Sequence, residues 1–359
     1  MVRFNLLTIK DIRRETPDCV SIAFEVPEEL RPFYQFKPGQ NLTLRLDMNG
    51  EEVRRSYSIC SSPLENELRI AVKQVFSGRF SSHANLKLQK GDKVEVMPPT
   101  GKFYTELQPD HKKKYLAFAA GSGITPILSI IKTSLATELN SEFILVYGNR
   151  NRNSIIFKEQ LEALKNRYID RLTIHHILSR EKTETPINHG RINGQKCDQL
   201  EKIIDFNTMD ELFLCGPEEM IFSVRDWLYQ KGIDPRKIHF ELFTVPGENK
   251  WLAGNVPLAE QEDLGPKSKV SIKLDGIMFE FELSKSGESI LDGALHQGTD
   301  LPFACKGGVC STCRAKLVSG EVSMDTNYAL EPDEIARGFI LTCQSHPITD
   351  SVLVDFDAK

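Results

Sequence analysis

The chain has 359 residues, of which 40% are hydrophobic and 26% charged. This length and composition predict two or three globular domains and exclude a disordered or low-complexity chain. Glycine and proline interrupt the longest apolar stretch, residues 115–131, which excludes a transmembrane helix. The first fifteen residues carry Lys10, Arg13 and Arg14 and lack the apolar stretch of a signal peptide. We therefore expect a cytoplasmic protein that has no membrane partner.

The net charge of −5 is unevenly distributed along the chain. Residues 268–359 contain 8 lysines and arginines against 14 acidic residues, whereas the rest contains 37 basic and 36 acidic residues. An acidic C-terminal part on a neutral body argues against a nucleic-acid partner. It fits either a module that docks on a basic protein surface or an acidic face that is only solvated.

Residues 2–100 alternate apolar and polar side chains in short runs, such as residues 42–46 and 68–75, with Pro-Gly and Asn-Gly turns between them. This pattern predicts a small antiparallel β-barrel. Arg55 and Tyr57 lie two residues apart in one predicted strand and therefore on the same face. Residues 78–82 read as a turn that enters a short helix, where an anion could bind.

The pattern changes at residue 114. A short buried strand, residues 114–120, precedes a glycine turn and an apolar helix over residues 126–138, which we expect Thr125 to cap with Pro126 in its first position. Strands then alternate with helices, which predicts a parallel, doubly wound α/β sheet. The remaining predicted strands are residues 142–147, 172–179, 211–215 and 238–243, and the remaining helices are residues 154–167 and 218–231.

Glycine-bearing or polar turns follow several strands of this sheet. They lie at residues 121–126, 147–150, 179–181 and 215–218. Taken singly, each turn is better explained by packing or by a solvated loop charge than by a ligand. Because the carboxyl ends of parallel strands meet at one edge, the turns together predict a nucleotide-binding crevice.

Residues 245–267 are rich in proline and glycine and have little apolar periodicity, so they predict a linker before an α+β module. The predicted domains are therefore residues 1–108, the barrel; residues 109–244, the α/β domain; residues 245–267, the linker; and residues 268–359, the α+β module.

Four of the eight cysteines, Cys305, Cys310, Cys313 and Cys343, fall in the last 55 residues with the spacing C-x4-C-x2-C-x29-C. This is the spacing with which plant-type proteins hold a [2Fe–2S] cluster, and the glycines between the first two let backbone N–H groups point at the sulfurs. Zinc is the alternative, although zinc sites usually pair two short C-x2–4-C segments.

The motifs at residues 55–58, 78–82, 121–126, 215–217 and 240–243 occur in an order that resembles the ferredoxin–NADP reductase family, here joined to a plant-type ferredoxin (β-grasp) domain. The whole chain resembles the reductase components of multicomponent oxygenases, the phenylacetyl-CoA epoxidase type among them. The resemblance implies a relay from NADPH through FAD and the cluster to a terminal oxygenase or other protein electron acceptor. It also implies a role in phenylacetate catabolism.

The resemblance implies three groups of site residues. Ser58, Cys215 and Glu241 position the reacting groups, and no strong acid–base pair is required. The four cysteines bind the metal cluster. The cofactor-binding set is Arg55, Tyr57, Ser58, Gly78, Phe80, Ser81, Ser82, Gly121, Gly123, Thr125, Arg150, Ser179, Arg180, Cys215 and Phe243.

Arg150 and Arg180 favour NADPH over NADH, because two cations suit a 2′-phosphate and no acidic residue directly follows residues 147–149 to hold a free 2′-hydroxyl. Other acceptors stay open: a hybrid-cluster protein, a steroid hydroxylase or a desaturase. A redox-sensing module without turnover and a zinc-stabilised interaction protein are also open. Steady oxidation of NADPH with ferricyanide would exclude the redox-sensing module. A coloured preparation would exclude the zinc-stabilised protein.

Overall fold

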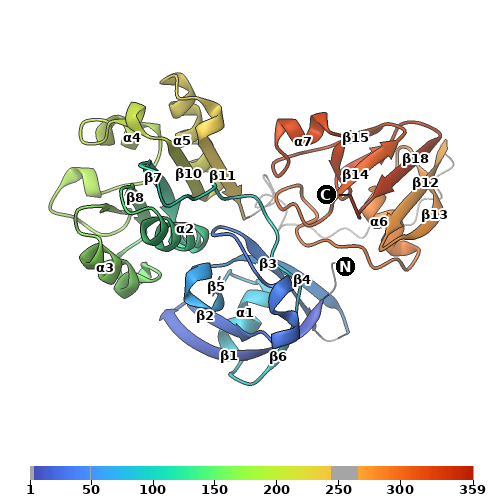
Figure 1. The fold of residues 1–359 in the computed structure, drawn as a ribbon, viewed down its shortest axis with the longest axis horizontal. Coiled ribbons are helices and arrows are strands. Elements are labelled where there is room, and N and C mark those ends of the chain that lie inside the picture. The colour runs from blue at the N-terminus through green and yellow to red at the C-terminus, as the bar shows by residue number, and fades with distance from the viewer. Residues whose placement is uncertain (1–3, 49, 244–265, 359) are drawn as a thin grey trace. The chain divides into compact units, whose positions relative to one another are not determined.

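The computed structural model describes residues 4–48, 50–243 and 266–358, and the chain divides into two units (Figure 1). The first unit spans Phe4–Phe243 and the second contains the C-terminal residues. The predicted linker, residues 245–267, lies outside the described residues up to residue 265. Within these described ranges, none of the helices has the length and apolarity needed to cross a bilayer.

The N-terminal part of the first unit is a six-stranded antiparallel sheet in the order β4-β3-β6-β1-β2-β5. An antiparallel bridge between Ile59 and Ile70 joins the two outer strands and closes the sheet around a buried apolar core. The helix α1 (Arg79–Leu86) packs on β5 and contributes Phe80 and Ala84 to that core. The strands are β1 (Asn5–Thr16), β2 (Cys19–Glu25), β3 (Asn41–Asp47), β4 (Glu52–Ser58), β5 (Leu68–Lys73) and β6 (Lys93–Val96).

The rest of the first unit is a five-stranded parallel sheet in the order β11-β10-β7-β8-β9. The chain runs outward from β7 through β8 to β9 and then returns to β10 on the other side of β7, which is the predicted doubly wound arrangement. The strands are β7 (Lys114–Ala120), β8 (Glu142–Asn149), β9 (Leu172–Leu178), β10 (Glu211–Gly216) and β11 (Ile238–Leu242). The helices are α2 (Ile124–Thr137), α3 (Lys158–Arg167), α4 (Gly194–Leu200) and α5 (Glu218–Gln230).

Helices cover both faces of this parallel sheet. Tyr115, Ala117 and Ala119 of β7 belong to the core that β7 shares with α2. Phe118 stacks on Phe206, which in turn packs edge-on against Trp227 of α5. Successive residues of β7 therefore serve opposite cores, as expected for a strand buried on both sides.

The prediction that Thr125 caps the helix after β7 is wrong. A 3-10 turn, η3 (Gly121–Gly123), leads directly into α2, so Thr125 is the second residue of the helix and its Oγ1 donates to the Ser122 carbonyl 3.0 Å away. The glycine turn continues into the helix without an extended cap residue, because Gly123 already has helical backbone angles.

Two other differences lie between residues 150 and 200. The helix predicted from residue 154 begins at Lys158, after Phe157 adopts a left-handed conformation with φ of 60°. The short helix α4 was not predicted, because its sequence is mostly polar and shows no apolar periodicity over seven residues.

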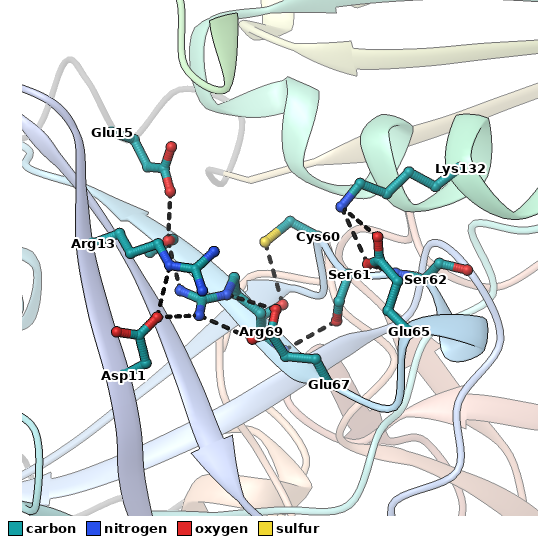
Figure 2. Close-up of polar contacts among 11 residues, drawn as sticks. Asp11, Arg13, Glu15, Cys60, Ser61, Ser62, Glu65, Glu67, Arg69 and Lys132 are labelled. Atoms are coloured by element: carbon teal, nitrogen blue, oxygen red, sulfur yellow. Dashed lines mark hydrogen bonds and ion pairs between the residues drawn. The ribbon is translucent and has the colours of Figure 1, made fainter. Parts of the chain in front are cut away.

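The barrel and the parallel sheet are joined through the segment after β4 and helix α2 (Figure 2). The hydroxyl of Ser129 donates to the Ser61 carbonyl at 2.6 Å, and Ser62 and Thr133 share a hydrogen bond of 2.9 Å. Lys132 and Glu65 form an ion pair at 3.1 Å beside them. These contacts fix one sheet relative to the other within the first unit.

The backbone of Arg69 in β5 is hydrogen-bonded to Cys60 and Ser61 of this segment, and its side chain is almost completely buried, with 3% exposed. Its guanidinium contacts Asp11 at 2.6 Å and Glu67 at 2.8 Å (Figure 2). It also donates to the Ser21 hydroxyl at 2.9 Å. The Arg69 hydrogen bonds hold the pKa values of Asp11 and Glu67 below their usual range. This stabilisation is present at neutral pH and is lost as the pH falls through those lowered pKa values.

Replacing Arg69 with methionine should destabilise the first unit by roughly 2–3 kcal/mol. This is less than the full loss of a buried ion pair, because Asp11 and Glu67 keep some water. Urea unfolding followed by flavin fluorescence measures the change. Arg13→Met is the control, since Arg13 contacts the same Asp11 from an exposed position and should change stability by less than about 0.5 kcal/mol. Equal effects of the two variants would contradict the role of Arg69.

The second unit is built on a five-stranded mixed sheet in the order β13-β12-β18-β14-β16, with β12 and β18 parallel. Two further strands, β15 and β17, pair in a separate two-stranded sheet. The apolar core of the unit includes Cys313 and Cys343. The strands are β12 (Lys267–Leu274), β13 (Ile277–Ser284), β14 (Arg314–Ser319), β15 (Val322–Met324), β16 (Phe339–Leu341), β17 (Ser345–Pro347) and β18 (Ser351–Asp355), and the helices are α6 (Ile290–His296) and α7 (Pro332–Ala336).

Candidate flavin, nucleotide and cluster sites

The strand β4 carries three of the predicted flavin residues. Arg55 is exposed and its guanidinium donates to the Arg54 carbonyl at 2.7 Å. Tyr57 is partly buried and its ring packs against Phe80, with 5.4 Å between the ring centroids. Ser58 ends the strand, is buried, and pairs in register with Asn41 of β3.

The predicted anion site is the start of α1. Gly78 is its N-cap and supplies no capping side chain, so the first backbone N–H groups of the helix lack an intrahelical partner. A Cβ on Gly78 would lie 2.4 Å from the Ser81 hydroxyl, and that hydroxyl accepts from the Val75 N–H. Ser82 follows, held by a hydrogen bond from Gln74. Bare N–H groups in a turn that leaves no room for a Cβ fit a diphosphate. Phe80 lies in the barrel core, so only its backbone can face such a ligand.

The second glycine turn lies beside the position where the strand order reverses. Gly121 has φ of 54°, and its carbonyl accepts a hydrogen bond from the Tyr147 hydroxyl at 2.9 Å. A Cβ on Gly123 would lie 2.0 Å from the Cys215 carbonyl oxygen, so only glycine lets the start of α2 approach β10 this closely. In doubly wound sheets, dinucleotides bind at the carboxyl ends of the strands where the strand order reverses, which is where this turn lies.

Ser58 and Glu241 meet near the carboxyl end of β11, although they are 183 residues apart. The Ser58 hydroxyl donates to Glu241 Oε2 at 3.0 Å, and the Asn41 side chain bonds the same carboxyl group. Burial raises the pKa of Glu241 to about 7, against the lowering effect of these two hydrogen bonds. The carboxyl group is therefore partly protonated near neutral pH, which marks it as a candidate functional group.

Cys215 lies beside Glu241 in the parallel pairing of β10 and β11. Its side chain is fully buried, and burial together with the charge of Glu241 raises the pKa of its thiol well above the usual value. The thiol is therefore neutral and serves as a small packing group. Phe243 follows β11, is 40% exposed, and is the last described residue of this unit.

Arg150 and Arg180 follow the neighbouring strands β8 and β9. The Arg180 N–H donates to the Arg150 carbonyl at 2.8 Å, and the Ser179 N–H donates to the Asn149 carbonyl at 2.9 Å. Both arginines are exposed. Glu181, the residue after Arg180, forms its ion pair with Arg152, at 3.2 Å, rather than with Arg150 or Arg180. Two exposed cations at adjacent strand ends fit a phosphate ester.

The four predicted cluster ligands converge in the second unit. Cys313 and Cys343 are buried, whereas Cys305 and Cys310 are partly exposed. The Cys305 sulfur lies within hydrogen-bonding reach of the Cys310 and Cys343 thiols, which hold its pKa far below the usual value. Four thiols that meet on one loop and the strand end opposite fit a [2Fe–2S] cluster.

The loop between the first two cysteines is held in a defined shape. Lys306 and Gly308 have φ of 54° and 73°. The Gly307 N–H points at the Cys305 sulfur, with 3.4 Å between nitrogen and sulfur, as expected from the glycines in this loop. The Gln344 amide donates to the Lys306 carbonyl at 2.9 Å and to the Cys343 sulfur at 3.8 Å. Such hydrogen bonds to ligand sulfurs tune the potential of a cluster.

Two participants in these sites were missed from the sequence. Asn41 is identified only by its register opposite Ser58, which no local motif reveals. Gln344 directly follows Cys343, but an amide at this place has no spacing signal of its own.

Comparisons with known proteins agree with this organisation. Three family models match the chain: an oxidoreductase FAD-binding domain over residues 6–104, an oxidoreductase NAD-binding domain over residues 118–226, and a 2Fe-2S iron-sulfur cluster binding domain over residues 272–347. One of the subunits of the 1,2-phenylacetyl-CoA epoxidase of Escherichia coli is 46% identical over 100% of this chain and 99% of its own.

A second relative, the ferredoxin reductase component of 3-ketosteroid-9-alpha-monooxygenase from Rhodococcus rhodochrous, is 35% identical over 98% of this chain and 96% of its own. Among solved structures, phthalate dioxygenase reductase matches with a TM-score of 0.60 and 26% identity, covering 98% of each chain.

These matches define a modular oxidoreductase with FAD-binding, NAD-binding and 2Fe-2S domains. The chain belongs to the family of reductase components of oxygenase systems, which pass electrons to an oxygenase partner. It accordingly uses FAD, NAD(P)H and a [2Fe–2S] cluster.

Proposed function

We propose that this reductase takes electrons from NADPH and delivers them, in the cytoplasm, to an oxygenase of the phenylacetyl-CoA epoxidase type. The observation that carries the proposal is the 46% identity with a component of that epoxidase over the full length of both chains. When bound, FAD accepts a hydride and releases electrons singly, and the cluster carries one electron at a time.

The residues of the barrel bind and orient the flavin in this proposal. Arg55 and the backbone N–H groups at the start of α1 hold the diphosphate. The small residues Gly78, Ser81 and Ser82 let the diphosphate come close to that backbone. Tyr57 lines the ring, supported from below by Phe80. A diphosphate held at both places favours FAD over FMN.

The nucleotide lies in the crevice over Gly121, Gly123 and Thr125, with Cys215 and Phe243 bordering the nicotinamide. Ser58 and Glu241 would provide a short proton path to a flavin bound beside Ser58. When Glu241 is ionised, the Ser58 hydroxyl donates to it and can accept a proton on its other side. When Glu241 is protonated, its own O–H can donate to the Ser58 oxygen, and the Ser58 hydroxyl can then donate on its other side.

Arg150, Ser179 and Arg180 form the part of the nucleotide site that distinguishes NADPH from NADH. Replacing Arg180 with glutamine should raise KM for NADPH roughly tenfold, because a charge-assisted contact to the 2′-phosphate is lost, and should leave KM for NADH within about twofold. Steady-state kinetics with ferricyanide measure both values. Arg167→Gln, an exposed arginine at the end of α3, is the control. A parallel rise for both nucleotides would contradict the assignment.

The acceptor is tested by reconstitution. The purified reductase should support NADPH-dependent turnover of the oxygenase component of a phenylacetyl-CoA epoxidase at a higher rate than turnover of a 3-ketosteroid 9-alpha-hydroxylating oxygenase. The second system is the alternative, because its reductase is 35% identical over nearly the whole chain. A higher rate with the ketosteroid system would replace the proposed acceptor.

A further inference from the structure

Lys196 in α4 is a buried lysine that takes no part in the sites described above. Only 5% of the residue is exposed. Its ammonium group donates to the carbonyls of Ile187 at 2.9 Å and His189 at 2.8 Å, and more weakly to that of Pro186 at 3.4 Å. The side-chain oxygen of Gln199 is a fourth acceptor at 2.6 Å, so the three ammonium hydrogens are shared among four oxygens.

This ammonium group is held by neutral oxygens. None of its four acceptors among the described residues is a carboxylate, and burial lowers its pKa. A buried charge destabilises a protein unless hydrogen bonds compensate it. Here three of the four acceptors are backbone carbonyls of one loop, so the charge stays buried only while residues 186–189 keep their present conformation.

The loop that Lys196 holds leads back to the predicted nucleotide segment. The His189 ring donates through Nδ1 to the Glu181 carbonyl at 3.1 Å, and the Gly190 N–H donates to the Leu178 carbonyl at 3.0 Å. His189 and Leu178 form a parallel bridge. Residues 189 and 190 therefore flank Ser179 and Arg180 on the side away from β8.

We infer that Lys196 is a positioning residue for NADPH selection: it clamps residues 186–189, and through His189 and Gly190 it fixes the segment that carries Ser179 and Arg180. The inference rests on the proposed role of Arg180 at the 2′-phosphate. Lys196 lies on a different element from Arg180 and does not itself contact the nucleotide in this assignment. It acts by keeping Arg180 in the place where its contact with the phosphate is favourable.

Replacing Lys196 with methionine keeps most of the length of the side chain and removes the charge. We expect KM for NADPH to rise roughly tenfold with kcat unchanged, and KM for NADH to change less than about twofold, because only the 2′-phosphate contact depends on the segment. The dissociation constant of 2′,5′-ADP, measured calorimetrically on the holoenzyme, should rise by the same factor. Lys202→Met, an exposed lysine just after α4, is the matched control.

Hydrogen exchange supplies a readout that is independent of turnover. The amides of Arg180 and Gly190 should exchange faster in the Lys196→Met protein, while those of β7 and β10 stay protected. If the methionine variant does not fold, Lys196→Gln keeps two donors and should show the same changes at smaller size. Unchanged exchange at these amides together with an unchanged KM would overturn the inference. A wild-type protein that does not prefer NADPH would instead contradict the proposed donor.

Discussion

The Cys310→Ala protein should reduce ferricyanide with NADPH at the wild-type rate and should lose its transfer to cytochrome c by at least roughly tenfold, because three thiolates do not hold the cluster. The flavin sites lie in the other unit and keep all their residues. Stopped-flow reduction of the flavin and steady-state assays with the two acceptors separate these steps. The loss of the cluster is read independently from its electron paramagnetic resonance signal after reduction.

The matched control for this variant is Cys197→Ala. Cys197 is also buried and free, but it lies in α4 of the first unit and is not one of the four cluster ligands. Its removal should leave the cluster signal and both activities unchanged. Undiminished transfer to cytochrome c in the Cys310→Ala protein would show that electrons leave from the flavin, and the order of the relay would be wrong.

The second large effect is expected at Glu241. The Glu241→Gln protein should oxidise NADPH with ferricyanide roughly 10–100-fold more slowly at pH 8, because glutamine cannot take a proton through Ser58. The wild-type rate should rise with pH through about 7, the pKa to which burial raises this carboxyl group. The variant should lose that dependence. A pH profile of flavin reoxidation measured on both proteins tests the expectation.

Ser58→Ala interrupts the same path from the other end. Since the two side chains share one hydrogen bond, the double variant should be no slower than the slower single variant. Additive losses, or a Glu241→Gln protein that keeps the wild-type pH profile, would show that the pair only packs against its neighbours.

Glu241 should also make the stability of the protein depend on pH. Its pKa is raised from 4.5 to about 7 in the folded state, so the folded form binds the proton more tightly than the unfolded form. Its contribution is full below pH 4.5 and is lost as the pH rises to about 7. The Glu241→Gln protein should therefore be more stable than wild type at pH 8 by up to about 3 kcal/mol and equal to it near pH 4.5. Urea unfolding at the two pH values measures the difference, and an equal difference at both would contradict the raised pKa.

The sequence predicted the sheets and the cluster because their signals are local. The strand over residues 114–120 and the glycine turn after it appear where predicted, since a buried apolar run and a glycine turn have few alternatives. The four cysteines are identified by spacing alone. The start of α2 was misplaced, because the close approach of Gly123 to the Cys215 carbonyl, which sets that start, joins residues distant in sequence.

Contacts across the fold could not be predicted in the same way. Ser58 and Glu241 come from different sheets, and the raised pKa of Glu241 depends on burial that arises only when they meet. Lys196 belongs to a short polar helix without apolar periodicity, so no sequence pattern indicates either the helix or the burial of its lysine. Its partners are mostly backbone carbonyls, which have no sequence signature.

The most direct test of the relay is the visible spectrum of the purified holoprotein, recorded anaerobically before and after addition of NADPH, with NADH in parallel. We expect flavin bands that overlap a broad cluster absorption, with both features bleached and the NADPH reaction faster. A colourless protein would contradict the flavin and the cluster together. Bleaching by NADH alone would retain the reductase and contradict the assignment of Arg150 and Arg180.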